Sequence, residues 1–386
     1  MNTGGKNMAH KSTSNKSNCL FQSVLSVLLT LALIWAAAPA SAKTIKIGAI
    51  LAETGPASFL GAPESRSLKM LVDEINKTGI KGGHTIELIV KDSGASAEKA
   101  VSFAKQLIEE ERVFAIIGPS TSGETLSIKK LCNKNKTILI SCGSAELIIN
   151  PQMPYVFKTA PSDSLAARKI FETMNGLNIS KVAVLTGNTG FGKAGKKQIM
   201  KIAPEYGIEL VESEVYDKKA TDLSAVVAKI KANKDVQAVI NWSIVPAQSI
   251  IAKNIRQAGW EVPLFQSHGF ANIKYAKAAG AAAEGIIFPA SRMIVARSLP
   301  EGDRKNFLLT FIDGYENKFH EAASTFSGHS YDAMMILKRA IESAGADKEK
   351  VRDAIENMKG YFGTAGEFNF SPTDHAGLKI DAFTMV

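Results

Sequence analysis

Short apolar runs rich in β-branched residues alternate along the chain with longer segments in which apolar residues recur every three or four positions. A short β-branched run predicts a strand, and the wider spacing predicts one face of a helix. The first unit has strands predicted at 45–51, 86–90, 113–117 and 138–140, and helices at 63–76 and 97–110. The proline-containing loop 150–154 closes this unit.

A second run of the same kind follows directly. Its predicted strands are 182–185, 208–215, 236–241, 264–265 and 286–288, and its predicted helices are 165–177, 193–206, 223–232 and 246–258. The repetition indicates a second unit built like the first.

The pattern changes after residue 288, where three helices follow without intervening strands. They are predicted at 303–319, 327–344 and 348–358. Helices without strands of their own must pack on a sheet that already exists, and we expect this to be the sheet of the first unit. Two strands are predicted in the tail, at 367–370 and 379–383, and we expect them at a sheet edge of the second unit.

Alternating strands and helices are typical of an α/β fold, with parallel sheets that helices cover on both faces. The chain exceeds the roughly 250–300 residues at which a single core stops growing, so we expect two lobes. The late helices and the tail require three crossings between lobes, near Pro161, Pro289 and Gly363. The predicted lobes are residues 43–160 with 290–362, and residues 161–289 with 363–386. Linkers that lie close together make a hinge, and the cleft beside it is a default ligand site.

The first 42 residues predict a cleavable signal peptide. Lysines without acidic residues precede an apolar run at 24–38, and a small-residue cleavage pattern ends at Ala42. The sequence leaves open whether Met1 or Met8 is the start. No later stretch reaches the ~20 apolar residues of a membrane span. We therefore expect export to the periplasm.

Charge and cysteine content exclude two simple interpretations. The formal net charge is +9, but the lysines are scattered over predicted helix faces, which favours a solvated surface over nucleic-acid binding. Cys132 and Cys142 fall at opposite edges of the predicted sheet, and five strand residues span roughly 16 Å. We expect no disulfide between them, although their redox state cannot be read from the sequence.

Two small, hydroxyl-rich loops follow consecutive predicted strands. They are Gly118-Pro119-Ser120-Thr121-Ser122-Gly123 and Ser141-Cys142-Gly143-Ser144-Ala145. The carboxyl ends of neighbouring parallel strands meet at one edge of a sheet, where ligands bind. Free amides at helix starts, together with Ser and Thr hydroxyls, suit a carboxylate or another small anion. Ordinary helix capping by Ser and Thr is the alternative.

No motif predicts an enzyme. The segment 187–193 matches the start of a phosphate-binding loop, but Ala194 stands where Ser or Thr is required. This segment presents Phe191 to the cleft or forms a plain tight turn. The segment 118–122 lacks the last glycine of a hydrolase elbow. The histidines show no metal-binding spacing, and we expect His320 and His329 to be structural or solvated. No cofactor or metal is expected.

Polar and aromatic residues also follow strands of the second unit. Trp242 ends one strand, with Ser243 next to it, and His268 lies in the loop after the following strand. All three would face the cleft if the topology is as predicted. A core position for Trp242 and a solvated loop position for His268 remain alternatives.

Five short segments carry a resemblance to a known family: IKIGAI at 45–50, ETGP at 53–56, FAIIGPS at 114–120, GFG at 190–192 and IRQAG at 255–259. In these, and over essentially the whole mature chain, the protein resembles the periplasmic leucine/isoleucine/valine-binding family, the solute receptors of ABC importers. The resemblance implies two Rossmann-like lobes joined by three strands. This is the type I periplasmic binding protein fold, or Venus-flytrap, which closes on a small carboxylate-bearing solute.

The resemblance also implies roles for individual residues. Ser122 would offer its hydroxyl and amide to the carboxylate, and Gly143-Ser144 would supply an amide and a second hydroxyl. Phe191 falls where the family often places a Tyr. Leu60 or Phe59 falls where an aromatic often covers the ligand. The full set of candidate ligand-binding residues is Phe59, Leu60, Thr121, Ser122, Cys142, Gly143, Ser144, Phe191, Trp242, Ser243 and His268.

One position departs from the family pattern. Amino-acid binders of this family usually carry an acidic residue for the α-ammonium in the loop where this chain has His268. Either another acid serves, or the ligand lacks an amino group, because an unpaired buried ammonium costs several kcal/mol. The ligand is then a branched-chain amino acid or an aromatic or aliphatic carboxylate.

The expected function is that of a periplasmic solute-binding receptor. Its partners would be a small carboxylate and the membrane permease of an ABC importer. We expect a monomer that binds no nucleic acid and performs no bond chemistry. A ligand-sensing module for signalling is the first alternative, and a secreted hydrolase that uses His268 is the second.

Overall fold

The structure is a computed structural model that describes residues 1, 4–5 and 43–386. The predicted signal peptide and its cleavage site fall almost wholly outside the described residues. Thr44–Val386 form one compact unit. No described helix combines the length and the hydropathy that a membrane span requires.

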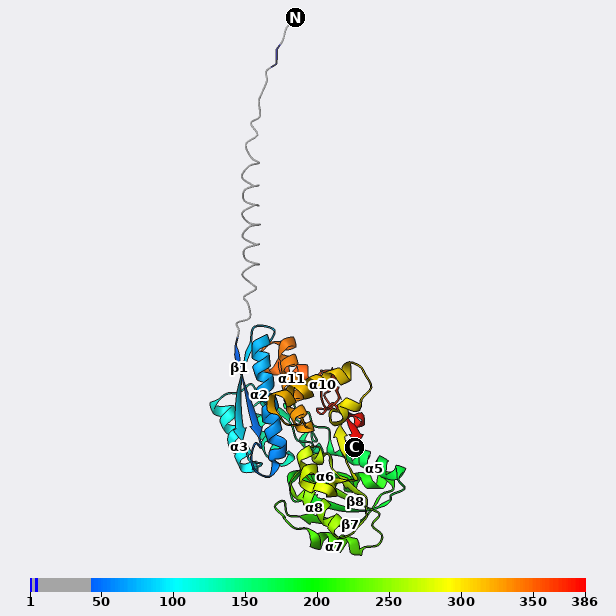
Figure 1. The fold of residues 1–386 in the computed structure, drawn as a ribbon. Coiled ribbons are helices and arrows are strands. Elements are labelled where there is room, and N and C mark those ends of the chain that lie inside the picture. The colour runs from blue at the N-terminus through cyan, green and yellow to red at the C-terminus, as the bar shows by residue number, and fades with distance from the viewer. Residues whose placement is uncertain (2–3, 6–42) are drawn as a thin grey trace. The chain divides into compact units, whose positions relative to one another are not determined.

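Five parallel strands form the first sheet, in the order β2-β1-β3-β4-β5 (Figure 1). Successive residues of a strand point to opposite faces, and each face has its own apolar core. Ile47 and Ile117 belong to one core, and Ile50 and Ile116 belong to the other. The strands are β1 (Thr44–Leu51), β2 (Thr85–Asp92), β3 (Ala115–Ile117), β4 (Ile138–Ser141) and β5 (Val156–Lys158).

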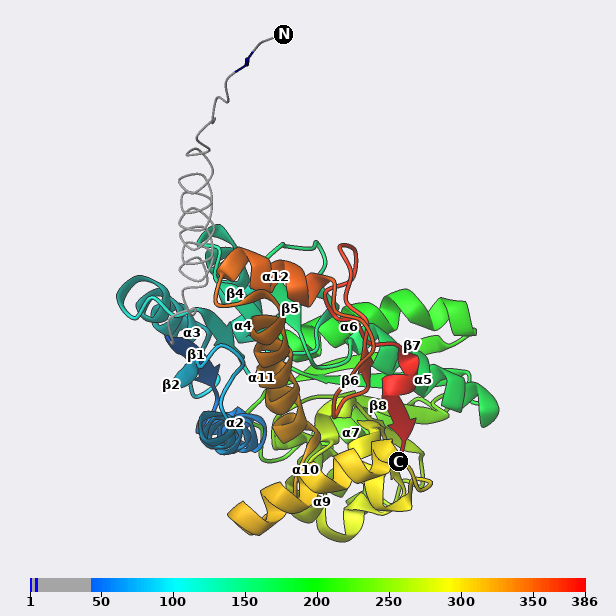
Figure 2. The same ribbon diagram turned by 90° about the horizontal axis from the view of Figure 1, so that it is seen from above.

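Helices cover both faces of this sheet. One face carries α2, α11 and α12, with α11 packed beside α2 (Figure 2), and the other carries α3 and α4. The late helices α11 and α12 therefore pack on the first sheet, as expected. The expectation is wrong for the helix at 303–319, whose apolar residues form a separate cluster with the turn Arg292–Ser298. The bounds are α2 (Ser58–Thr78), α3 (Ala97–Lys105), α4 (Ser122–Lys134), α10 (Asp303–Phe319), α11 (Thr325–Ala344) and α12 (Lys348–Glu356).

The second sheet repeats this arrangement, with parallel strands in the order β10-β9-β8-β6-β7. Its strands are β6 (Lys181–Gly187), β7 (Glu209–Tyr216), β8 (Ala238–Trp242), β9 (Leu264–Gln266) and β10 (Ile286–Ile287). Its helices are α5 (Asp163–Gly176), α6 (Gly190–Ile202), α7 (Ser224–Ala232), α8 (Ala247–Gln257) and α9 (Ile273–Ala279). The predicted α/β class with two parallel sheets is confirmed.

Short helical turns complete the described chain. They are Gly55–Ala57, Gln106–Glu110, Glu146–Ile148, Ala203–Tyr206, His268–Phe270, Gly280–Ala283, Arg292–Ser298 and Ile380–Ala382.

The tail differs from the prediction. β12 (Tyr361–Phe362) pairs with β13 (Glu367–Phe368) in an antiparallel ribbon, and Phe368 and Phe370 join the core of the first sheet. The expectation that 367–370 would join a sheet edge in the second lobe is wrong, because these aromatic side chains are buried beside the first sheet. Only the last strand, β14 (Phe383–Met385), lies near the second sheet, and it pairs antiparallel with β11 (Pro289–Ser291).

This packing bears on the predicted lobe boundaries. The crossing near Pro161 lies between β5 of the first sheet and α5, whose apolar face joins the core of the second. Asp332 of α11 accepts hydrogen bonds from the amides of Thr364 and Ala365 at 2.7 and 3.0 Å. These bonds hold the segment after Gly363 against the first lobe. The boundaries as a whole remain a prediction. The burial of Ala365, Phe368, Phe370, Leu378 and Ala382 in the core of the first sheet argues for assigning this segment to the first lobe.

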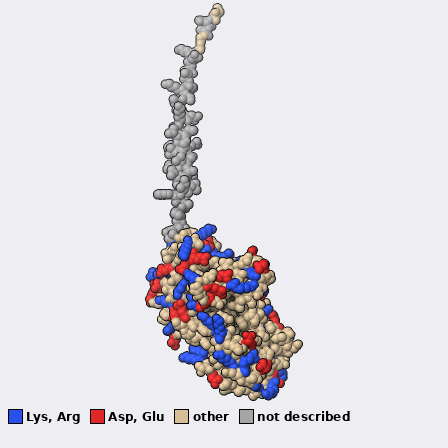
Figure 3. Space-filling view, in the orientation of Figure 1, with Lys and Arg blue, Asp and Glu red and all other residues tan. Residues whose placement is uncertain are grey.

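Two predictions about side chains can be compared with the structure. Cys132 and Cys142 are both free and lie in the cores on opposite faces of the first sheet. Basic and acidic side chains are interspersed over the face seen in Figure 3, with no large basic patch in view.

Candidate functional site

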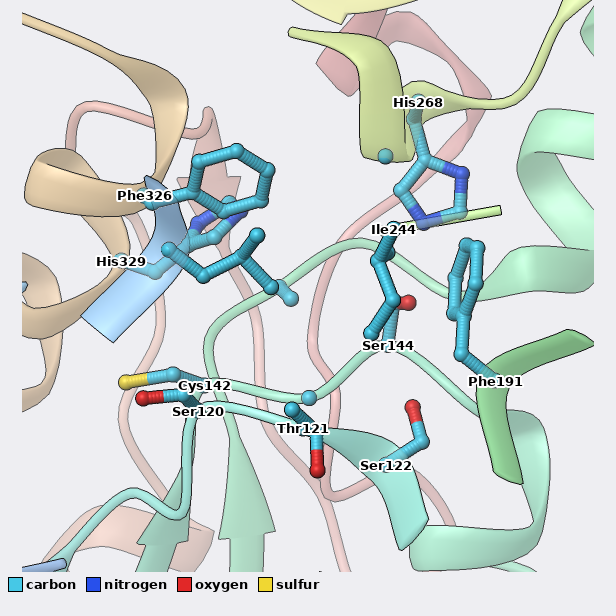
Figure 4. A pocket seen from close by; sticks show the side chains of 14 residues that line it. Ser120, Thr121, Ser122, Cys142, Ser144, Phe191, Ile244, His268, Phe326 and His329 are labelled. Atoms are coloured by element: carbon cyan, nitrogen blue, oxygen red, sulfur yellow. The ribbon is translucent and has the colours of Figure 1, made fainter. Parts of the chain in front are cut away.

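A small cavity lies between loops of the two sheets and the start of α11 (Figure 4). Most of its wall comes from three places: the loops after β3 and β4, the segments that follow β6, β8 and β9 of the second sheet, and the start of α11. Leu60 of α2 and Ala160 after β5 complete it. Of the described chain, fourteen residues line it: Leu60, Ser120, Thr121, Ser122, Cys142, Gly143, Ser144, Ala160, Phe191, Ile244, His268, Gly269, Phe326 and His329.

The loop after β3 ends as the N-terminus of α4. Thr121 is the N-cap: its hydroxyl accepts from the Glu124 amide at 3.3 Å and donates to Oε2 of Glu124 at 2.5 Å. The capping interpretation therefore holds for Thr121. The amide of Ser122 begins the helix and has no acceptor within it. The Ser122 hydroxyl accepts from the Ala145 amide at 3.1 Å, so its own hydrogen is left for another acceptor.

The loop after β4 lies directly against the first loop. A Cβ on Gly143 would stand only 3.0 Å from the Ser122 amide nitrogen. The predicted adjacency of the two loops is thus what the structure shows. The Gly143 amide is already used, because it donates to the Ser141 hydroxyl at 2.9 Å. The Ser144 hydroxyl lines the cavity and makes no hydrogen bond within residues 43–386.

Ser120 and Cys142 also line the cavity, on the side of the first sheet. The hydroxyl of Ser120, which was not among the predicted residues, donates to the carboxyl group of Glu64 and accepts from the Ala52 amide. Burial raises the pKa of Glu64 well above its usual range. Burial, with the nearby Glu64, also raises the pKa of the Cys142 thiol. Burial thus favours the uncharged form of Glu64 and of Cys142.

Phe191 and His268 form the opposite wall (Figure 4). Phe191 follows the N-cap Thr189, whose hydroxyl accepts from the Gly192 amide at 3.0 Å. The His268 ring packs against Phe191, Trp242 and Phe383, with ring centroids 5.2, 5.5 and 5.3 Å away. Both of its nitrogens are buried without a hydrogen-bond partner. Burial and the charge of Lys158 lower the pKa of His268 to about 3, so the ring is neutral.

Three predicted residues do not line the cavity. Trp242 is fully buried behind Phe191, with ring centroids 5.7 Å apart, because it fills the space against α6. Ser243 is buried at the turn after β8, where its hydroxyl accepts from the Val245 amide. Phe59 packs against Tyr275 with centroids 5.0 Å apart, and its neighbour Leu60 faces the cavity instead.

The first turn of α11 supplies two lining residues that the sequence did not suggest, Phe326 and His329 (Figure 4). The expectation that His329 is structural or solvated is wrong, because its buried ring faces the cavity and its Nδ1 has no partner. Burial lowers the pKa of His329 to about 3. The helix start at the capping residue Ser324 is a local signal, but only tertiary packing brings this turn to the cavity.

The cavity therefore has a polar side and an apolar side. Ser122 and Ser144 offer hydroxyl donors on one side, and Leu60, Phe191, Ile244 and Phe326 enclose the remainder. None of the described residues that line it is acidic, and residues 43–386 contain no His, Cys, Asp and Glu cluster that could hold a metal ion. The arrangement suits a small ligand with one anionic end.

Comparisons with known proteins agree with this geometry. The family model of the periplasmic binding proteins matches residues 44–382. The leucine-, isoleucine-, valine-, threonine- and alanine-binding protein of Pseudomonas aeruginosa is 26% identical over 321 residues, which cover 82% of this chain and 83% of that protein.

Two solved structures have the same fold. An extracellular ligand-binding receptor from Rhodopseudomonas palustris is 26% identical with a TM-score of 0.82, and the match covers 89% of this chain and 96% of that one. The branched-chain amino acid transporter substrate-binding protein LivJ of Streptococcus pneumoniae, in complex with isoleucine, is 27% identical with a TM-score of 0.77. That match covers 87% and 94% of the two chains.

Proposed function

The chain belongs to the periplasmic binding protein family, and we propose that its ligand is a small carboxylate without an α-ammonium group. The family consists of non-enzymatic proteins, and the chain is the solute-binding protein of an ABC transporter. The observation that carries the proposal is the absence of any acidic side chain among the described residues that line the cavity.

The anionic end of the ligand would lie at the two serine loops. The Ser122 hydroxyl has its hydrogen free, the Ser122 amide is at a helix start, and the Ser144 hydroxyl has no partner in the described protein. A hydrogen bond to a charged group contributes roughly 1.5–3 kcal/mol. Three such donors support tight binding of a carboxylate. Thr121, Gly143 and Cys142 would shape this end, because their own polar groups are used or uncharged.

The body of the ligand would fill the apolar side. Leu60, Phe191, Ile244 and Phe326 supply the apolar surface of this side. A single aromatic ring or a branched aliphatic chain is the kind of body that such side chains bind. The unpartnered nitrogens of His268 and His329 would accept a hydroxyl hydrogen or donate to an oxygen on this body.

An amino acid is a poorer fit to this wall. A buried ammonium without a carboxylate partner costs several kcal/mol. Neutral His268 could accept one hydrogen bond but supplies no opposite charge. In Glu64, an acid next to the cavity, burial raises the pKa and disfavours the charged form, and Oε2 already accepts from Ser120.

A branched-chain amino acid is the second candidate. The names of the Pseudomonas and Streptococcus relatives favour it. Oε1 of Glu64, which is buried and unpartnered, also favours it, because an ammonium there could ionise the acid. Binding of leucine would then require Glu64 to lose its proton.

Matched ligand pairs separate the two candidates. Leucine and 4-methylpentanoate share one carbon skeleton and differ only in the amino group, and so do phenylalanine and 3-phenylpropanoate. Thermal shift followed by isothermal titration calorimetry should show tighter binding of the acids without the amino group. If leucine binds more tightly than 4-methylpentanoate, the ligand is an amino acid and the proposal is wrong.

Ligand binding would shift the protein toward a closed form. Ligand contacts on both walls favour closure only by the extra affinity that the second wall adds. Ser122 and Ser144 follow strands of the first sheet, whereas Phe191 and His268 follow strands of the second. The closed form would then dock on a membrane permease. Small-angle scattering with and without ligand tests the closure.

A further inference from the structure

Lys158 is a fully buried lysine that none of the sequence patterns singled out. It ends β5, and its Nζ donates to the carbonyl oxygen of Ser144 at 2.7 Å. No carboxylate oxygen among residues 43–386 lies within 4.0 Å of this nitrogen. Buried charges in proteins are normally paired, because desolvation of a lone ammonium is costly. The missing counter-ion therefore needs an explanation.

A chain of hydrogen bonds joins Lys158 to the cavity. The peptide group between Ser144 and Ala145 accepts from Lys158 through its carbonyl oxygen. Through its N–H it donates to Oγ of Ser122 at 3.1 Å. The Ser122 hydroxyl hydrogen is then directed to whatever occupies the cavity. Each hydrogen bond in such a chain polarises the next, so the ammonium strengthens the Ser122 hydroxyl as a donor.

We propose that Lys158 is the counter-ion of the bound carboxylate and sets the preference of the site for anions over neutral ligands of the same shape. This role rests on the proposed function. Lys158 is a positioning residue, since it acts through the Ser144–Ala145 peptide and Ser122 and does not line the cavity itself. A carboxylate at Ser122 would provide the negative charge that the protein does not place within ion-pair distance of Lys158.

The surroundings of Lys158 leave this charge open to a ligand. Asp163, Glu146 and Asp374 act on it only at longer range. Oδ1 of Asp163 accepts from the Glu146 amide at 2.9 Å, Oδ2 is buried without a partner, and burial raises the pKa of this carboxyl group to about 6. Across the cavity stand His268 and His329, both neutral. Burial lowers the pKa of Lys158 to about 8. An anion in the cavity favours the protonated form, so binding should take up a proton where Lys158 is partly deprotonated.

Titration calorimetry with the wild-type protein measures this proton directly. The titrant is 4-methylpentanoate, in two buffers with different ionisation enthalpies, at pH 8 and at pH 7. We expect uptake of about half a proton per ligand at pH 8 and about a tenth at pH 7. Lower pH is avoided because the pKa of the nearby Asp163 is about 6, so its carboxyl group would itself take up protons there. Carboxylate binding without proton uptake at pH 8 overturns the role of Lys158. This readout needs no variant and so does not depend on whether a variant folds.

Substitutions give a second, independent readout. Lys158→Met should lower the affinity for 4-methylpentanoate at least tenfold and change that for 4-methylpentanamide less than threefold, whereas Lys158→Arg should keep the preference for the acid. An unchanged preference in Lys158→Met contradicts the proposal.

The proton measurement also separates this inference from the proposed function. If leucine binds and 4-methylpentanoate does not, the proposed ligand class fails, and the same calorimetry with leucine still tests Lys158. If no carboxylate of either series binds, both proposals fail together.

Discussion

Gly123 and Gly190 face each other across the cleft with no side chain between them: a Cβ on Gly190 would lie 2.5 Å from the Cα of Gly123. Gly123 is in the first turn of α4, beside the first sheet, and Gly190 begins α6, beside the second. Each glycine is the chain neighbour of a cavity residue: Gly123 follows Ser122, and Gly190 precedes Phe191. This contact therefore sets how closely the two cavity walls can approach.

Gly190→Ala should weaken ligand binding without destabilising the free protein. The added methyl group collides with Gly123 only when the walls are close, and the clash disappears when the cleft opens. Overpacking of this kind costs about 1–3 kcal/mol, which corresponds to a loss of roughly 5- to 150-fold in affinity. Calorimetry with the best ligand and scattering in its presence measure the effect.

Gly123→Ala is the matched control for this substitution. A Cβ on Gly123 would lie 3.5 Å from the Cα of Gly190, which is an ordinary contact. Its affinity should stay within about threefold of wild type. Equal effects of the two substitutions would contradict a steric limit set at Gly190.

Ser144→Ala should reduce carboxylate affinity and leave stability unchanged. The Ser144 hydroxyl lines the cavity and has no partner within residues 43–386, so its removal breaks no hydrogen bond of the free protein. Loss of one hydrogen bond to a charged ligand costs roughly 1.5–3 kcal/mol, or about 10- to 150-fold in affinity. Ser127→Ala, outside the cavity on α4, is the control. Unchanged binding by Ser144→Ala removes this hydroxyl from the site.

The two neutral histidines should make the protein sensitive to acid. Their pKa is about 3 in the folded protein and about 6.5 when unfolded. Between these values the unfolded chain binds more protons, so the free energy of unfolding falls as pH is lowered from 6.5 toward 3. The slope is about 1.4 kcal/mol per pH unit for each histidine at most.

His329→Phe removes one such group and should flatten the profile. Urea unfolding of this variant and of wild type at pH 7, 5.5 and 4.5 isolates the histidine, because the carboxylates are common to both. If the free energy of unfolding falls equally with pH in the two proteins, His329 takes up its proton in the folded state as readily as in the unfolded state, which contradicts the prediction.

Gly195→Ala tests the layer behind the cavity. A Cβ on this glycine of α6 would overlap the indole ring of Trp242, which supports Phe191 and His268 from behind. We expect a loss of about 1–3 kcal/mol in the free energy of unfolding. Gly176→Ala is the control, since no atom lies within 4 Å of its Cβ position. An effect no larger than that of the control would show that Trp242 shifts freely.

The sequence predicted the parts of this protein that follow from local pattern. The runs at 45–51 and 138–140 have the β-branched character of buried strands, and both lie in one parallel sheet, with β3 between them, by the ordinary rules of α/β folds. The position of the two serine loops followed from that topology. The Gly143 contact with the Ser122 amide shows that the loops meet.

Other features depend on packing that no local pattern records. Trp242 ends a strand that is buried on both faces, and periodicity does not say which side its ring takes. His329 reaches the cavity only because α11 returns to the first sheet. Lys158 ends a strand of three residues, too short for a pattern, and lysine is rarely found in a core.

The burial of Cys142 gives this protein a natural reporter of its own motion. Cys142 lines the cavity, whereas Cys132, the other described cysteine, lies in the core on the opposite face of the first sheet. A small alkylating reagent can reach Cys142 only while the cavity is open and empty. The labelling rate of the wild-type chain therefore times how often the walls part, and protection from labelling measures ligand occupancy without any introduced probe.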